Sequence, residues 1–327
     1  MVFCKKSKIV KSIILMFSII VFNLLYACGN KEYKYSQNIY VAWSNIKNSY
    51  SFVSTLKTIE AVGARPVVLE QVKSADLKYD ENNKIIDATD ENGILTLDAA
   101  KQIKINTWQN SNVKEVMKGV DCVVFPGGVD ICPTLYYDEE EWHGILDDSE
   151  YSAERDTSDY LLLSYCLEND IPMLCICRGM QMLSVVSGAD MIQDIATWYA
   201  KQGLNYKLLH RDIDKKDFMP HSVTISSKES LLYQIYGEGI IDKVPSWHHQ
   251  AVKSVDNTRL VVTAYTDTDG YKIIEAVERP DKKFCVGVQF HPEVAVRKIL
   301  DKEVDAEKYM EYDKAIILFK ALLERKQ

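Results

Sequence analysis

Short apolar runs alternate with segments of helical periodicity along much of the chain. The run at 39–43 is followed by apolar residues at helical spacing that stop at Gly63, and 66–69 is a second apolar run. A strand, a helix and a strand within about 30 residues form a βαβ unit, whose strands are parallel and whose crossover is right-handed. The pattern therefore predicts a largely parallel sheet covered by helices.

The same two patterns continue toward the C-terminus. The segment 73–118 is more polar, with a predicted hairpin and a short helix near 113–117, and Asp156 is the predicted N-cap of a later helix. A β-ribbon is expected around Asp269 and Gly270. Together these elements predict a three-layer α/β/α sandwich, flavodoxin-like, with a mostly parallel central sheet and an added β-ribbon. The further strands are predicted at 121–125, 171–176, 190–194, 221–225, 259–264, 273–277 and 284–290, and helices at about 156–168 and 315–323.

One predicted strand leads directly into candidate chemistry. Residues 171–176 are apolar and run through Cys177 into a helix that begins at Arg178. A cysteine at such a turn is held at the end of the sheet, facing the positive end of the next helix, which favours the thiolate. This is the geometry of a nucleophile elbow.

A thiol nucleophile needs a base and a group that orients the base. His291 follows the buried strand at 284–290, so it should reach the sheet edge where Cys177 emerges, and Glu293 is two residues further on. Ligands of open parallel sheets bind at this carboxyl edge. Two glycines at 127–128, with the amide of Arg178, are placed to form an oxyanion hole.

The first 27 residues have a different composition from the remainder. Four lysines precede an apolar run at 13–26, which is roughly 14 residues long and too short for a comfortable membrane span. The run ends in Leu-Tyr-Ala-Cys, which resembles a bacterial lipobox and implies cleavage before Cys28 and lipidation of its sulfur. We therefore expect a signal peptide at 1–27, a lipidated tether at 28–38 and one domain at 39–327, exported and anchored to the cell membrane or outer membrane. An uncleaved anchor helix is the alternative.

The charge and cysteine content narrow the class of protein. The 327 residues are 47% hydrophobic and 26% charged, which is enough to build a sizeable core. Cleavage would remove four of 39 basic residues and leave 47 acidic ones, a net charge of −12 that argues against nucleic-acid binding. The spacing of the remaining cysteines matches no zinc or disulfide framework.

Four motifs occur in the order of a known family. They are Pro-Gly-Gly-Val-Asp at 126–130, Cys-Arg-Gly-Met-Gln at 177–181, Ser-Trp-His-His-Gln at 246–250 and Gly-Val-Gln-Phe-His-Pro-Glu at 287–293. With them, residues 39 to about 300 resemble the class I glutamine amidotransferase-like superfamily, and more closely its peptidase C26 branch, the γ-glutamyl-γ-aminobutyrate hydrolase-like proteins.

The resemblance implies a role for each matching residue. Cys177 would be the nucleophile, His291 the general base and acid, and Glu293 the third member of a triad. Gly127 and Gly128 would help to form the oxyanion hole. The residues implied to border the substrate are Gln181, His248, His249 and Gln250.

The chain departs from the family pattern at two places. Cys175 stands where the family usually has glycine, and Ser187 replaces the first of two glycines after the elbow helix. Cys175 as the nucleophile is an alternative, although it lacks the following Arg-Gly turn. Cys177 as an inert core cysteine is another.

The leading functional hypothesis is a hydrolase of γ-glutamyl amide bonds that works through a γ-glutamyl thioester and calls for no metal or organic cofactor. One alternative is a glutaminase-type amidotransferase, which export disfavours because no synthetase partner is expected outside the cytoplasm. The other is a surface lipoprotein that uses the fold as a non-catalytic binding module. The expected partners are a small γ-glutamyl substrate and the membrane, and homo-oligomerisation is left open.

Overall fold

The computed structural model describes residues 35, 37–138, 150–206, 210–212, 217–268 and 270–325. The chain divides after Ser36, and the second unit, Gln37–Gln327, is described below. The predicted signal peptide and the lipidation site Cys28 lie outside the described residues. Within the described part of the chain, no helix has both the length and the apolarity needed to cross a membrane.

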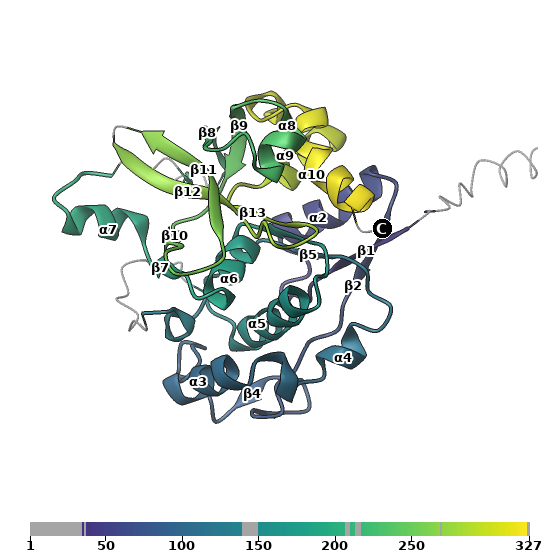
Figure 1. The fold of residues 1–327 in the computed structure, drawn as a ribbon, viewed down its shortest axis with the longest axis vertical. Helices are drawn as coiled ribbons and strands as arrows, with labels where there is room; N and C mark the ends of the chain where they lie inside the picture. Colours follow the sequence, from purple (N-terminus) through teal and green to yellow (C-terminus); the bar gives the residue numbers. More distant parts are fainter. Residues whose placement is uncertain are drawn as a thin grey trace, which may run out of the picture. The chain divides into compact units, whose positions relative to one another are not determined.

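A nine-stranded sheet forms the centre of the second unit (Figure 1). Its spatial order is β2-β1-β5-β6-β13-β12-β11-β8-β9. The strands from β2 to β13 are mutually parallel, and those from β12 onward are antiparallel. The predicted ribbon, β11 with β12, is therefore continuous with the main sheet. The strand bounds are β1 (Asn38–Val41), β2 (Arg65–Val68), β5 (Val123–Phe125), β6 (Met173–Ile176), β8 (Met219–Ile225), β9 (Ile240–Ser246), β11 (Val261–Thr268), β12 (Tyr271–Glu278) and β13 (Cys285–Val288).

Helices cover both faces of this sheet. α2 (Tyr50–Ala61), α9 (Pro292–Leu300) and α10 (Tyr312–Arg325) pack together over one face, and α5 (Ala153–Glu168) and α6 (Arg178–Val186) pack over the other (Figure 1). Successive side chains of a strand point to opposite faces, so β6 contributes to both cores. The predicted three-layer α/β/α sandwich is confirmed.

The polar segment 73–118 folds into small elements beside α5. The expected hairpin is β3 (Lys78–Tyr79) paired with β4 (Ile85–Ile86), and the expected short helix is α4 (Val113–Val116). α3 (Leu97–Asn106) was not predicted from the sequence, although Thr96 caps it and its apolar side is buried.

Several later elements were also missed or placed differently. β7 (Asp190–Ile192) pairs with β10 (Ala251–Ser254), and α7 (Ile195–Lys201) and α8 (Leu231–Tyr236) are additional helices. The N-cap of α5 is Ser152, whose hydroxyl accepts the Arg155 amide, so the expectation that Asp156 caps this helix was wrong. Asp156 instead lies inside the first turn and is fully buried.

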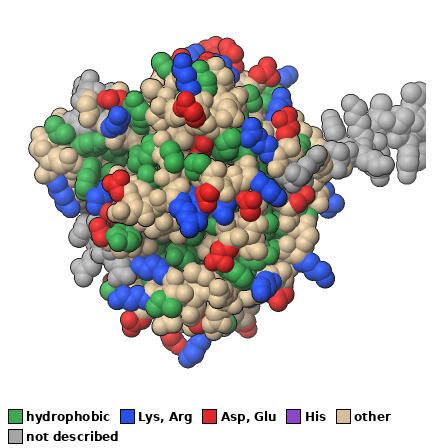
Figure 2. Space-filling view, in the orientation of Figure 1, with side chains coloured by type: hydrophobic (Ala, Val, Ile, Leu, Met, Phe, Trp, Pro, Cys, Tyr) green, Lys and Arg blue, Asp and Glu red, His purple; other side chains and the backbone are tan. Residues whose placement is uncertain are grey.

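The surface carries charges of both signs. On the face drawn in Figure 2, basic and acidic side chains are interspersed with apolar ones. A mixed surface of this kind favours solubility and does not concentrate a single-sign field on that face.

The packing of α6 on β5 depends on Gly179. A Cβ atom there would lie 2.3 Å from the Phe125 carbonyl oxygen, which is backbone and cannot move aside. We expect Gly179→Ala to lower the free energy of unfolding by about 1–3 kcal/mol, measured by urea denaturation. Gly239→Ala is the control, because nothing lies within 4 Å of its Cβ position. Equal unfolding midpoints for the two variants would contradict this packing argument.

Candidate active site

Cys177 occupies the turn between β6 and α6. Its φ is 49° and its ψ is −106°, a region that residues other than glycine seldom adopt. Its amide donates a hydrogen bond to the Val288 carbonyl at 2.7 Å, which ties the turn to the end of β13. The strained turn directs the side chain to the carboxyl edge of the sheet, as in a nucleophile elbow.

His291 and Glu293 reach the same edge from β13. β13 pairs in parallel with β6, with Val288 opposite Ile176, so the residues after both strands emerge together. His291 Nδ1 lies 2.7 Å from Glu293 Oε1, and the carboxylate accepts the ring proton. This bond leaves the Nε2 side of the ring available for chemistry with Cys177.

The charge state of His291 is controlled by its neighbours. Burial alone would lower the pKa of this imidazole, but the negative charges of Cys177 and Glu293 raise it to about 10. His291 is therefore an imidazolium at neutral pH when the Cys177 sulfur is a thiolate. A thiolate beside an imidazolium is the resting state that a cysteine nucleophile requires.

Ser51 of α2 is a member of this site that the sequence analysis missed. Its hydroxyl donates a hydrogen bond to Glu293 Oε1 at 2.7 Å and lies 3.4 Å from His291 Nδ1. Gly127 packs against the same group, since a Cβ there would lie 2.6 Å from His291 Cε1. Glu293 is thus held by a helix from the start of the domain.

The glycine turn after β5 is oriented by Arg155, also missed from sequence. The Arg155 guanidinium donates to the carbonyl oxygens of Pro126 at 3.0 Å and Gly127 at 2.9 Å. In a trans peptide the carbonyl and the following amide point in opposite directions, so the amides of Gly127 and Gly128 point away from Arg155. A Cβ at Gly128 would overlap this guanidinium, which explains the need for glycine.

Arg178 contributes its backbone, while its side chain serves a buried ion network. The guanidinium donates to Asp156 and Asp159 of α5, and all three side chains are fully buried. Burial and the charge of Arg178 lower the pKa of nearby Arg155 to about 10. The network fixes the start of α6, where the Arg178 amide belongs to the first turn, whose N–H groups have no partner within the helix.

The implied substrate residues border the same space. Gln181 donates to the Gln250 carbonyl at 3.1 Å, and Gln250 donates to the Tyr136 hydroxyl at 3.0 Å. His249 lies between Asp130 and Asp194, and although burial lowers its pKa, hydrogen bonds to these carboxylates raise it to about 9.

His248 is oriented differently from His249. Its Nδ1 lies 2.8 Å from the Gln250 carbonyl, and its Nε2 points toward Glu275, 3.9 Å from Oε1. Burial lowers the pKa of this ring to about 3. His248 therefore borders the cavity as a neutral side chain.

These residues surround a cavity of about 660 Å³, a size typical of small-molecule sites. Charged residues in its wall that the sequence analysis did not single out include Arg211, Glu150 and Asp130. Gly127, Arg178 and Glu293 are not among the lining residues. The predicted residues that line the cavity directly are Gly128, Cys177, Gln181, His248, His249, Gln250 and His291.

The two departures from the family pattern fall into packed positions. Cys175 is fully buried in the core under α5 and α6, and burial raises the pKa of its thiol well above the ordinary value. It fills core space two residues before the elbow. Ser187 ends α6, and the required left-handed residue is supplied by Gly188 with a φ of 86°.

An elbow cysteine, a histidine with a carboxylate and a glycine turn at the edge of an α/β sandwich are the features of class I glutamine amidotransferase-like proteins. The sequence model of the family described as Peptidase C26 matches residues 80–293. The chain therefore belongs to the peptidase C26 family. This membership places it among cysteine-dependent enzymes of the amidase and amidotransferase type.

Individual relatives agree with this placement. A glutamine amidotransferase-like protein of Rickettsia prowazekii is 30% identical over 57% of this chain and 75% of its own length. Protein NtpR of Enterococcus hirae is 35% identical over 54% of this chain and 67% of its own length. Among solved structures, the glutaminase domain of a Trypanosoma brucei CTPS has a TM-score of 0.48 at 17% identity, over 89% of this chain and 94% of that domain.

The pKa of His291 is expected to depend on Glu293. Glu293→Gln removes one of the negative charges that raise it, so the pKa should fall from about 10 by about 1–3, toward the ordinary 6.5. A histidine is charged below its pKa, so the variant should lose its imidazolium at a lower pH than the wild type. Titration of the ring by NMR measures this change. Ser51→Ala is the control, because it keeps the carboxylate, and an equal fall in both variants would contradict the assignment.

Proposed function

We propose that this protein hydrolyses γ-glutamyl amide bonds. The observation that carries the proposal is the convergence of Cys177, the His291–Glu293 pair and the glycine turn on one cavity. A nucleophile, a base with its orienting acid, and backbone donors are the groups that acyl transfer requires. Membership of the peptidase C26 family supports the same chemistry.

The first half of the reaction would form a thioester. The Cys177 thiolate attacks the γ-carbonyl carbon, and the amides of Gly128 and Arg178 stabilise the oxyanion. His291 then gives its Nε2 proton to the leaving amine, the C–N bond breaks, and a γ-glutamyl thioester remains on Cys177. Glu293 holds the ring through Nδ1 during this transfer.

The second half would consume water. The neutral His291 takes a proton from a water molecule as its oxygen attacks the thioester carbon. The C–S bond breaks, glutamate leaves, and the thiolate–imidazolium pair is restored. No step requires a group beyond these side chains and water.

The charges of the cavity wall support a γ-glutamyl head group. Such a group carries an α-carboxylate and an α-ammonium, and the wall contains two arginines, Arg155 and Arg211, together with Asp130 and Glu150. The α-carboxylate would therefore pair with an arginine of the wall, and the α-ammonium with an acidic side chain. The names of the relatives keep a glutaminase-type amidotransferase as the alternative.

The test compares substrates and labels the nucleophile. Purified full chain is incubated with γ-glutamyl amides, γ-glutamyl peptides and free glutamine, and with a glutamine-like electrophile whose attachment site is found by mass spectrometry. We expect release of glutamate and the amine, label on Cys177, and a loss of at least about 10³-fold in kcat/KM for Cys177→Ser.

The matched control is Cys175→Ser, which changes a buried thiol two residues away. It should leave labelling at Cys177 intact. Turnover of glutamine alone would favour the glutaminase alternative. Neither label nor turnover on any γ-glutamyl compound would favour a binding module and refute the hydrolase.

We also propose that the domain is exported and lipid-anchored through Cys28. The support is the sequence of residues 13–28, with its basic flank, its short apolar run and its lipobox-like end. Cys28→Ala should abolish the lipidated form in the membrane fraction, so that the protein is either released as soluble protein or keeps its signal peptide. Cell fractionation and intact-mass analysis measure both results. An unchanged membrane fraction without a lipid mass on the wild type would support the uncleaved anchor instead.

A further inference from the structure

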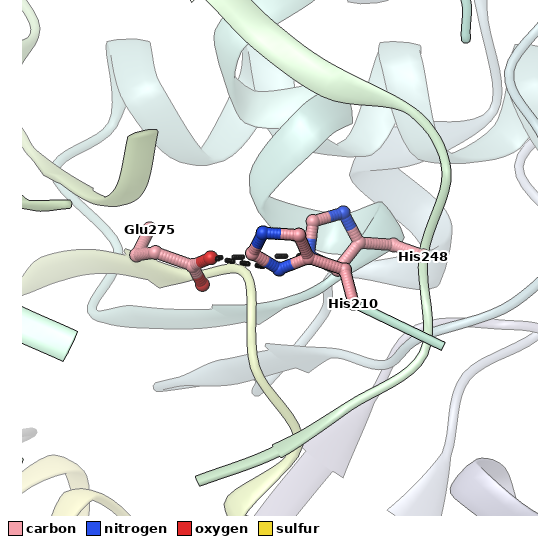
Figure 3. Close-up of side chains that lie close together, drawn as sticks. All are labelled: His210, His248 and Glu275. Atoms are coloured by element: carbon pink, nitrogen blue, oxygen red, sulfur yellow. Dashed lines mark ion pairs between the residues drawn. The ribbon is translucent and has the colours of Figure 1, made fainter. Parts of the chain in front are cut away.

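Beside the cavity, three histidines converge on one buried carboxylate. His210 precedes β8, His221 lies on β8, His248 follows β9, and Glu275 lies on β12. Figure 3 shows the rings of His210 and His248 directed at the Glu275 carboxylate. We call these four residues the histidine cluster. No step of the proposed reaction uses it.

The distances from Glu275 to the histidine nitrogens are close to the ligand spacing of a tetrahedral metal site. Zinc bonds of about 2.0–2.2 Å place neighbouring ligand atoms roughly 3.3–3.5 Å apart. Glu275 Oε1 lies 3.3 Å from His210 Nδ1, 3.7 Å from His221 Nε2 and 3.9 Å from His248 Nε2. The ligand atoms of His210, His248 and Glu275 all lie within 4.8 Å of one another, a group that does not include His221. Closure around an ion would therefore draw the histidine nitrogens together by up to roughly 1.3 Å and bring His221 inward.

The outer contacts orient these groups as metal ligands are oriented. His248 Nδ1 is bonded to the Gln250 carbonyl at 2.8 Å, and His221 Nδ1 to the Ser222 carbonyl at 3.2 Å. Because a carbonyl only accepts, each Nδ1 carries the proton and each Nε2 presents a lone pair to the cluster. Thr266 donates to Glu275 Oε1 at 2.8 Å. Bonds of this kind fix the tautomer and direction of metal ligands.

Without a cation, the polar groups of the cluster lack partners. His221 Nε2, His248 Nε2 and Glu275 Oε2 are buried and make no hydrogen bond to the described residues. A proton on Glu275 could serve one nitrogen and would leave the other lone pairs unmatched, at a cost of about 1–3 kcal/mol for each buried group. A single water molecule could donate hydrogen bonds to two of these groups. One divalent cation would take the lone pairs of both nitrogens and neutralise the charge of the carboxylate.

We propose that His210, His221, His248 and Glu275 bind one zinc ion in a closed, structural site. Three imidazoles and one carboxylate form a donor set that zinc accepts in tetrahedral geometry. Four protein ligands leave no open position for a substrate, which distinguishes this site from a catalytic one. The ion would allow Glu275 to remain ionised in a fully buried place.

The site would brace the wall of the catalytic cavity. The His248 amide donates to the His210 carbonyl at 3.1 Å, and the Gln289 amide donates to the Glu275 carbonyl at 2.8 Å. The side chain of Gln289 in turn donates to Cys177 Sγ at 3.4 Å. The ion would thus connect four segments of the chain, and these segments position residues 246–250 and the nucleophile.

The first experiment measures metal in the full chain, produced without a histidine tag and purified without chelator. We expect one zinc ion per chain by mass spectrometry. We also expect Co²⁺, loaded after zinc removal, to give the strong visible bands of tetrahedral coordination without a thiolate charge-transfer band. Absence of stoichiometric zinc and failure to bind Co²⁺ would overturn the proposal and leave a water molecule or a proton in the cluster.

The second experiment assigns the ligands. Glu275→Gln and His221→Asn should each weaken Co²⁺ binding by at least about 100-fold, the upper end of the loss typical of an outer-shell partner. Glu278→Gln is the matched control, because this buried carboxylate lies on the same strand and accepts the amides of Leu231 and Leu232. Its affinity should equal that of the wild type. A thiolate band that disappears in Cys177→Ser, or unchanged affinity in both ligand variants, would place the ion elsewhere and refute the site.

Discussion

The parallel register between β6 and β13 is the constraint on which the site depends. It sets Val288 opposite Ile176, so the chain leaves both strands at one edge and delivers Cys177 and His291 together across more than a hundred residues of sequence. A slip of one residue would turn every side chain of the strand to the other face. The bond from the Cys177 amide to the Val288 carbonyl fixes that register at its functional end.

A second constraint keeps the elbow in its strained form. A non-glycine residue with φ of 49° persists only where its surroundings determine its conformation. Here the following helix cannot shift, since Gly179 lies against the β5 backbone and Arg178 is held by two buried carboxylates of α5. Losing one partner of such a network costs about 3–5 kcal/mol, because the remaining charge stays buried. Removal of one partner would therefore destabilise the fold and the elbow together.

Local patterns were enough to predict the parts of the site that lie on strand ends. The elbow, the positions of His291 and Glu293 and the glycine turn each follow a short apolar run, and that run can be recognised within about ten residues of sequence. Ser51 and Arg155 could not be found in this way. Each lies on a helix whose sequence resembles any amphipathic helix, and each finds its partner only after the sheet has assembled. Helix α3 was missed for the same reason, because only three of its residues are buried: Ala99, Ala100 and Ile103.

The histidine cluster shows why the His-His pair at 248–249 cannot be interpreted from sequence alone. The two rings are adjacent in the chain but point to opposite environments: His249 lies between two carboxylates at the cavity, and His248 faces Glu275 behind the wall. Their pKa values consequently move in opposite directions, raised for His249 by its acidic neighbours and lowered for His248 by burial. One ring thus keeps its charge at the cavity wall, while the other keeps the neutral lone pair that a metal ion requires. The same short segment, residues 246–250, therefore supplies one side chain to the cavity wall and one to the histidine cluster.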